Sequence, residues 1–482
     1  MKTSKIVGGL VVLAAGRLAA QGVDRSHPPL LDDPPALTLP RATTLSLPNG
    51  LSLYVVPMHE VPLVQLVLNV PGGGLADGPQ PGLASFTAGM LDEGAGDRDA
   101  IAVAAQAAYL GASLSTGADW NGMTVSLKVP RSTMPQALDL MADVALRPRF
   151  AAAEVARQRD LRLAGILQRR DRPNTMASIA YAALLFPADH PYHNSIGGDS
   201  ASTVVLDSAT VRGFYDRYFV PRHARLIVTG DVTPEEVREL IDARFGEWRA
   251  AAADPAAGGA VPPVTSAAVT RPRTIFLVDK PGAAQSVIRM GSAGVERDNP
   301  DYYAIQVMNT ILGGSFSSRL NSILREEKGY TYGAGSGFQF NPVPGPFIAG
   351  AAVRTNVTDS SLAIFFNEFD DLRHTAVSQT ELDRAKAYLA LGLGMGFETT
   401  SQMAGQIDGL LTLGLPLDYY DDYVDHVMSI TTEEVLHAAR KYLAPEEFTV
   451  VVVGDVDSIR KPIERLGLGP VAVVTMHGVP AE

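Results

Sequence analysis

The chain has 482 residues, a formal net charge of −12 and no cysteine. The acidic balance argues against nucleic acid as a partner, because phosphate binding requires a basic face. The missing cysteine excludes disulfide bridges, thiolate nucleophiles and cysteine-based zinc sites. With 46% hydrophobic residues, a chain of this length is expected to fold into two large domains or about three smaller ones.

The N-terminus has the layout of a secretory signal peptide. Lys2 and Lys5 precede an uncharged run at residues 6–16, and small residues follow up to Ala20. The run is too short to span a bilayer, so no stable membrane insertion is expected. We therefore expect residues 1–20 to be a signal peptide cleaved near Ala20, and the mature protein to be exported to the periplasm. An ordinary N-terminal tail is the alternative.

The elements expected in the first half mix strands and helices. Apolar, β-branched runs at residues 51–56 and 63–70 predict two strands that pair as a hairpin, with His59 and Glu60 in a solvated turn. The rest of this half predicts strands at 123–129 and 226–228 and helices at 81–90, 100–110, 152–170 and 234–245.

The second half is expected to follow the same plan. Its pattern predicts a strand at 274–278 and helices at 302–312, 317–327, 381–395 and 432–442. Strands and helices follow one another without strict alternation, so the expected fold class is α+β and not a doubly wound parallel sheet.

A repeat at one fixed spacing indicates a duplicated domain. Tyr218-Phe-Val-Pro221 recurs 224 residues later as Tyr442-Leu-Ala-Pro445, and the Gly-Asp-Val at 230–232 recurs at 454–456 with the same offset. Pro57, after the first strand, matches Pro281 in the same way.

An alanine-, proline- and glycine-rich stretch separates the two copies. Residues 250–272 contain few large apolar side chains, which is a linker composition. We expect a proline-rich leader at 21–44, an N-terminal domain at 45–249 and a C-terminal domain at 273–474.

The segment Gly82-Leu-Ala-Ser-Phe-Thr-Ala-Gly-Met90 resembles the zinc-binding helix of the M16 (pitrilysin/insulinase, processing-peptidase-like) metallopeptidase family. In that family the helix carries H-x-x-E-H, whose two histidines bind zinc while the glutamate serves as general base. The matching residues here are Ser85, Ala88 and Gly89, and Gly165 replaces the glutamate of a later helix that would be the third ligand. A catalytic zinc needs about three protein ligands. The resemblance therefore implies no catalytic residue and no metal in this chain.

The best local pair of histidines is His190 and His193, with Asp189 beside them. Pro191 makes this segment a loop, which removes the helical spacing that a paired ligand motif needs. A packing or capping role is therefore expected for both histidines.

A second segment, Leu324-Arg-Glu-Glu-Lys-Gly-Tyr-Thr-Tyr-Gly333, resembles the other M16 signature, an arginine and a tyrosine seven residues apart. Arg325 and Tyr332 have this spacing, whereas Tyr330 does not and is expected to pack. An arginine fork can hold peptide carbonyl groups, and a tyrosine hydroxyl can donate to the oxyanion formed during cleavage. A helix-end arginine is more often a solvated cap, so the surrounding string carries the substrate-binding hypothesis.

The resemblance implies two homologous halves in a clamshell arrangement, each a sheet packed with helices, around a cavity for extended peptides. It also implies a homologous partner subunit that carries H-x-x-E-H and the zinc, with this chain as the non-catalytic subunit. Two alternatives stay open: a purely structural subunit, like the M16-derived core proteins of respiratory complexes, and a stand-alone peptidase with unrecognised ligands.

Overall fold

The computed structural model describes residues 38–249 and 259–481. The expected signal peptide, most of the leader and residues 250–258 of the expected linker lie outside the described residues. In the part of the chain that is described, none of the helices combines the length and the hydropathy needed to cross a bilayer.

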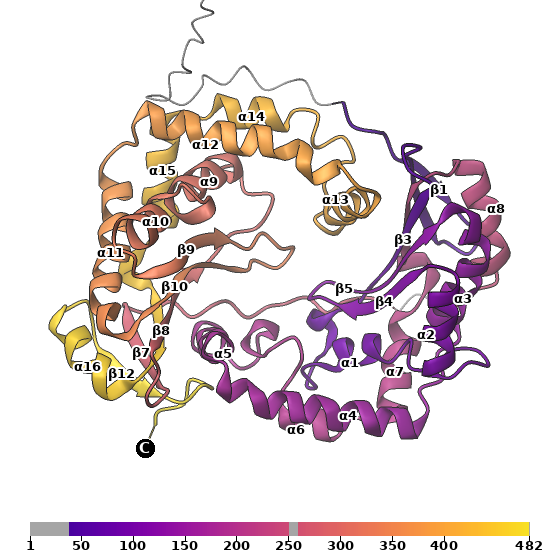
Figure 1. Ribbon diagram of the computed structural model, residues 1–482, viewed down its shortest axis with the longest axis horizontal. Helices are drawn as coiled ribbons and strands as arrows, with labels where there is room; N and C mark the ends of the chain where they lie inside the picture. Colours follow the sequence, from indigo (N-terminus) through magenta and orange to yellow (C-terminus); the bar gives the residue numbers. More distant parts are fainter. Residues whose placement is uncertain (1–37, 250–258, 482) are drawn as a thin grey trace, which may run out of the picture. The chain divides into compact units, whose positions relative to one another are not determined.

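Two six-stranded sheets organise the described residues (Figure 1). The first sheet runs, in spatial order, β1 (Thr43–Ser46), β2 (Ser52–Pro57), β6 (Arg225–Gly230), β3 (Leu63–Pro71), β5 (Gly122–Pro130) and β4 (Ser113–Ala118). The second runs β12 (Val471–Val474), β7 (Thr274–Asp279), β11 (Thr449–Gly454), β8 (Gln285–Ala293), β10 (Pro346–Arg354) and β9 (Thr331–Phe338). The expected α+β fold class is confirmed.

The expected hairpin between residues 51–56 and 63–70 is wrong. Both strands form, but β6 lies between them, parallel to β2 and antiparallel to β3. Strand β6 is almost entirely buried, and a buried strand needs a hydrogen-bonding neighbour on each side. The segment between β2 and β3 also contacts the end of β6, because His59 Nδ1 lies 2.7 Å from Oδ1 of Asp231, the residue after β6.

The sequence repeat is also a repeat of topology. Strands β6 and β11 each have a parallel neighbour on one side and an antiparallel neighbour on the other. The sheets differ at the outer strand, because β1 is antiparallel to β2 whereas β12 is parallel to β7. This shared order supports duplication, while the boundaries 45–249, 250–272 and 273–474 stay predictions.

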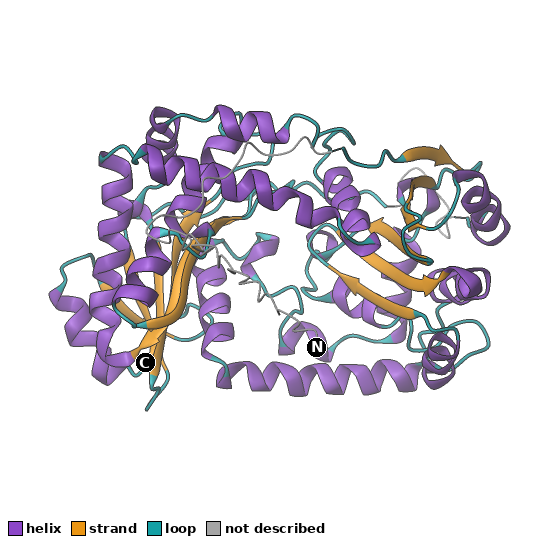
Figure 2. Cartoon of the chain, turned by 45° about the horizontal axis from the view of Figure 1, so that its top comes forward, coloured by secondary structure: helices purple, strands orange, loops and turns teal. Residues whose placement is uncertain are grey.

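Helices pack against the strands of both sheets (Figure 2). Those of the first half are α1 (Leu83–Gly89), α2 (Ala100–Tyr109), α3 (Met134–Leu146), α4 (Ala152–Leu167), α5 (Pro173–Leu185), α6 (Ser200–Val204), α7 (Ser208–Tyr218) and α8 (Pro234–Phe245). Those of the second half are α9 (Tyr302–Asn309), α10 (Arg319–Asn321), α11 (Thr358–His374), α12 (Gln379–Gly392), α13 (Thr400–Thr412), α14 (Tyr423–Ser429), α15 (Thr432–Tyr442) and α16 (Val456–Arg465).

The expected helices at 234–245 and 432–442 are confirmed with the same bounds, as α8 and α15. The expected helix at 317–327 is instead the single turn α10 followed by a wider π-helical turn, η7 (Ser322–Glu327). Such π turns are uncommon and occur frequently at functional sites.

Each sheet is covered by a helix from the other half of the sequence. Tyr181 and Leu184 of α5 pack in one apolar cluster with Val451 of β11. Met403 and Ile407 of α13 pack with β2 and β6. Helices α5 and α13 occupy matching positions of the repeat, so the two copies exchange equivalent helices.

Candidate functional site

Helix α1 carries the three positions that correspond to H-x-x-E-H. The Asp77 carboxylate accepts hydrogen bonds from the backbone N–H groups of Gly82 and Ala84, each over 2.7 Å. These bonds satisfy donors that the first turn of a helix leaves free. Gly82 has φ 90°, and a Cβ there would lie 2.6 Å from the backbone nitrogen of Gly198, so the start of α1 requires glycine.

The four degenerate positions do not form a ligand set for zinc. Ser85 accepts a hydrogen bond over 3.0 Å from Nη1 of Arg162, on α4. Ala88 is buried in the core and has no donor atom. A Cβ added at Gly89 or Gly165 would meet nothing within 4 Å. In residues 38–249 and 259–481, no three His, Cys, Asp or Glu side chains are grouped so that they could hold a metal ion.

A pocket of about 510 Å³ lies between α1 and α4, and both Gly89 and Gly165 line it. Arg162 lines the same pocket, and its guanidinium lies 4.9 Å from the centre of the Phe86 ring. Burial lowers the pKa of Arg162 to about 10. The positively charged guanidinium of Arg162 therefore borders the space next to the segment that corresponds to H-x-x-E-H.

The structure places Arg325 in η7, in the last turn before a helix end of the αL type. Gly329 has φ 60° and donates its N–H to the Arg325 carbonyl over 3.1 Å, while Tyr330 donates to the Leu324 carbonyl over 2.8 Å. The left-handed glycine and its bond to the carbonyl four residues earlier define the αL helix end. Tyr330 packs against the core of the second half, as the sequence predicts.

Tyr332 is the second residue of the edge strand β9, and 89% of it is exposed. Asn321 holds this strand beside η7, because its Oδ1 accepts from the Ala334 N–H over 3.2 Å. The Arg325 guanidinium lies 4.8 Å from the centre of the exposed Phe316 ring, and its Nε lies 3.1 Å from Glu326 Oε1. The arginine and the tyrosine thus stand on adjacent elements, both open to solvent.

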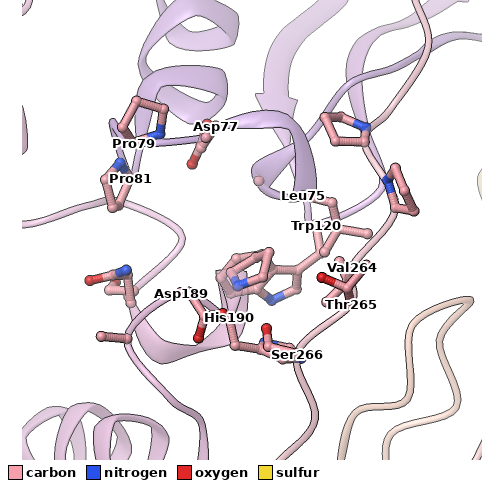
Figure 3. Close-up of a pocket in the computed structure, with 18 residues that line it drawn as sticks. Leu75, Asp77, Pro79, Pro81, Trp120, Asp189, His190, Val264, Thr265 and Ser266 are labelled. Carbon is pink, nitrogen blue, oxygen red and sulfur yellow. The ribbon is translucent and has the colours of Figure 1, made fainter.

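A second pocket, of about 360 Å³, lies beside the start of α1 (Figure 3). Asp77 and His190 line it, and burial lowers the pKa of His190. His190 Nδ1 accepts from the Tyr192 N–H over 3.0 Å, and the Tyr192 ring meets Trp120 edge-on at 4.9 Å. His193 Nδ1 lies 2.8 Å from the Phe186 carbonyl oxygen. These contacts agree with a packing and capping role for the loop.

The comparisons with known proteins agree in pointing to one family. Residues 55–180 match the model of the insulinase (peptidase M16) family, and residues 206–389 match that of the peptidase M16 inactive domain. An uncharacterized zinc protease of Mycobacterium bovis is 26% identical over 441 residues, which cover 90% of this chain and 97% of that protein. A Helicobacter pylori protein described as a non-peptidase homolog is 21% identical, over 82% of this chain and 90% of its own.

The crystal structure of a peptidase M16 inactive domain from Pseudomonas fluorescens has the same fold, with a TM-score of 0.78 and 28% sequence identity. The match covers 86% of this chain and 98% of the Pseudomonas fluorescens chain. The chain belongs to the M16 peptidase family. Its residues 206–389 match the model of the family's inactive domain, and in the described residues no group of His, Cys, Asp or Glu side chains could hold a metal ion.

Sequence reasoning missed Arg162 and Asp77. Arg162 stands three residues before Gly165, one helical turn away on the same face of α4, so an arginine one turn from a missing ligand was the available signal. Asp77 lies in a loop five residues before Gly82, and its two bonds to the helix start depend on a chain path that the pattern does not disclose.

Proposed function

We propose that this protein is the non-catalytic, substrate-binding subunit of an exported M16B-type zinc peptidase that degrades or processes peptides. A homologous subunit with an intact H-x-x-E-H motif would supply the zinc and the general base. Arg325 and Tyr332 of this chain would bind an extended peptide at the shared active site.

The observation that carries this proposal is the contrast between the two signature segments. The zinc positions keep no ligand set, whereas Arg325 and Tyr332 stand exposed on two elements fixed by a helix end and by Asn321. A tyrosine that served only the fold would gain stability from burial or from fixed partners. The Tyr332 side chain is instead free to reach a ligand.

Each of the two residues has a defined chemical role in this proposal. The Arg325 guanidinium donates hydrogen bonds to peptide carbonyl oxygens and so holds the substrate in the ground state. The Tyr332 hydroxyl donates to the carbonyl oxygen as it becomes an oxyanion, which stabilises the transition state. Zinc in the partner subunit would polarise the scissile carbonyl group and activate the attacking water.

Export is part of the proposal and rests on the charged start, apolar run and small residues of the N-terminus. A periplasmic fraction should contain a protein that begins close to Gln21. Recovery of the uncleaved chain in the cytoplasm would contradict export without touching the binding role.

The test is a peptidase assay with the mature chain alone, with the H-x-x-E-H homologue alone, and with both. We expect no bound zinc and no cleavage from this chain alone, and cleavage of a fluorogenic peptide on mixing. Arg325→Ala should raise KM by about tenfold, because it removes ground-state binding. Tyr332→Phe should lower kcat by about 100-fold, in the range for loss of one oxyanion donor.

Matched controls are Tyr109→Phe on α2 and Arg384→Ala on α12, which change exposed residues of the same types on other elements. Both should leave KM and kcat unchanged. Full activity of the mixture with both Arg325→Ala and Tyr332→Phe would favour a purely structural subunit. Chelator-sensitive cleavage by this chain alone would overturn the proposal in favour of a stand-alone peptidase.

A further inference from the structure

The charged side chains that line the pocket between α1 and α4, called the arginine pocket below, are all positive. Arg162, Arg169 and Arg172 line it, and none of its described lining residues is acidic. Two of the four former zinc-motif positions, Gly89 and Gly165, are in its wall. Beside two positions that correspond to zinc ligands of the family, this chain therefore offers an open space lined by three arginines.

Arg162 has no carboxylate partner among the described residues. The nearby Asp77 carboxylate is bonded to the backbone N–H groups at the start of α1. Glu93 is bonded to Arg157 and Gln158 on α4. Removal of a guanidinium from water is unfavourable, and burial together with the charge of Arg169 lowers the pKa of Arg162. The charge of Asp77 favours the ionised form of Arg162 without an ion pair between them.

Part of the Arg162 guanidinium remains available to a ligand. Nη1 donates to the carbonyl of Gly82 over 2.9 Å and to Oγ of Ser85 over 3.0 Å. Nε and Nη2 make no hydrogen bond to any residue in the described ranges. Arg169 donates to the carbonyl groups of Gly198 and Gly197, so it contributes charge to the pocket but few free donors.

The two glycines leave room for the ligand. A Cβ at Gly89 or Gly165 would meet nothing within 4 Å, so both positions open directly into the arginine pocket. A carboxylate fits this site, because its two oxygens match the fork of a guanidinium. Among the groups of an unmodified peptide, carboxylates are the ones that carry a full negative charge.

We propose that the arginine pocket binds a carboxylate of the peptide substrate, either the free C-terminus or an acidic side chain, with Arg162 as the principal ligand. The peptide as the source of this carboxylate rests on the proposed function. The chemistry of the pocket itself does not. In this site a negative group of the substrate lies beside Gly89 and Gly165, two positions that correspond to zinc ligands of the family.

The pocket is tested by itself with short probes. N-acetyl-Ala-Ala with a free carboxylate and the same dipeptide as its amide are titrated against the full mature chain by ligand-observed NMR. We expect the acid to bind at least about tenfold more tightly, the fold-change that one charged hydrogen bond supplies. Arg162→Gln should remove this preference. Equal binding of acid and amide by the wild type would overturn the inference.

A second pair of variants avoids any loss of folding that Arg162→Gln could cause. Gly165→Glu places a carboxylate inside the pocket, where it should pair with Arg162 and abolish binding of the acid. Gly165→Gln is the matched control with nearly the same volume and helix propensity, and it should keep at least part of the preference. Equal loss of binding in both variants would mean that the pocket senses volume and not charge, and would contradict the proposal.

A nine-residue peptide separates this inference from the proposed function. It is prepared with a free C-terminus, with an amidated C-terminus, and amidated with a central Asp. Preference for the first or the third form identifies the terminal or the side-chain carboxylate as the ligand. Binding of all forms that is equal and sensitive to Arg325→Ala would reject the carboxylate site and keep the proposed function. Binding of the dipeptide acid without binding of any nine-residue form would do the reverse.

Discussion

The hydroxyl group of Tyr181 donates a hydrogen bond over 2.9 Å to the carbonyl oxygen of Phe347, and so joins helix α5 of the first half to strand β10 of the second. Tyr181 is buried, and burial raises the pKa of its hydroxyl group far above the usual value. A Cβ at Gly291 of β8 would lie 2.8 Å from this hydroxyl and even closer to the Phe347 carbonyl. The contact therefore requires glycine on the neighbouring strand.

Tyr181→Phe is expected to lower the free energy of unfolding by about 1–2 kcal/mol. The ring still fills its place in the apolar cluster, but the Phe347 carbonyl loses a partner in a buried position, and an unpaired buried acceptor is unfavourable. Urea unfolding measures the change. Tyr109→Phe, at an exposed position on α2, should change it by less than about 0.5 kcal/mol. No change in Tyr181→Phe would mean that water replaces the lost bond.

Local sequence patterns predicted the individual helices and strands better than they predicted which of these elements lie side by side. Helix α8 was predicted with the bounds that the structure has, because a proline start and an apolar period are local signals. The hairpin failed because the partner of β2 and β3 is β6, which lies more than 150 residues further along the chain. The sequence also does not predict that α5 and α13 each pack on the sheet of the other half, since either helix has an apolar face that fits a sheet of either half.

The same distinction holds for the candidate site. Missing ligands at Ser85, Ala88, Gly89 and Gly165 are visible in the sequence alone, because a donor atom is present or absent. The guanidinium of Arg162 beside Ser85 is a contact between two helices. Its presence could be read from the sequence, but the sequence could not show that Arg162 forms no ion pair within residues 38–249 and 259–481.

The position of Arg162 leads to a prediction about the zinc affinity of a variant in which the ligands of the family are restored. A variant with Ser85→His, Ala88→Glu, Gly89→His and Gly165→Glu restores the family's ligand types. We expect it to bind zinc at least about tenfold more weakly than the same variant with Arg162→Leu added. The guanidinium beside position 85 repels the metal ion, and two like charges a few ångströms apart cost on the order of several kcal/mol near a protein surface. It also competes for the new glutamate at position 165.

Zinc affinity of the two variants is compared by competition with a chromogenic chelator, after unfolding curves have shown that both fold. Arg170→Leu, added to the fourfold variant in place of Arg162→Leu, removes an exposed arginine from the same segment. This control should not raise the affinity. Equal zinc binding with and without Arg162 would show that its charge is screened from the site.

Asp77 predicts a dependence of stability on pH. Burial raises the pKa of this carboxyl group from 3.8 to about 6, even though the backbone N–H groups of Gly82 and Ala84 favour its charged form. Between these two pH values the folded state holds a proton that the unfolded state has lost. Stability from this group is therefore fully present below about pH 4 and decreases as the pH rises through 6.

Asp77→Asn removes this titration and keeps one acceptor oxygen for the start of α1. The free energy of unfolding of the wild type, relative to that of Asp77→Asn, should therefore fall between pH 4 and pH 7. The fall should be at most about 3 kcal/mol, since each unit of pKa difference corresponds to about 1.4 kcal/mol. Asp160→Asn, at an exposed carboxyl group on α4, should give a curve parallel to the wild type. If the Asp77→Asn curve is parallel as well, the carboxyl group of Asp77 keeps its ordinary pKa, and its two bonds to the helix start outweigh its burial.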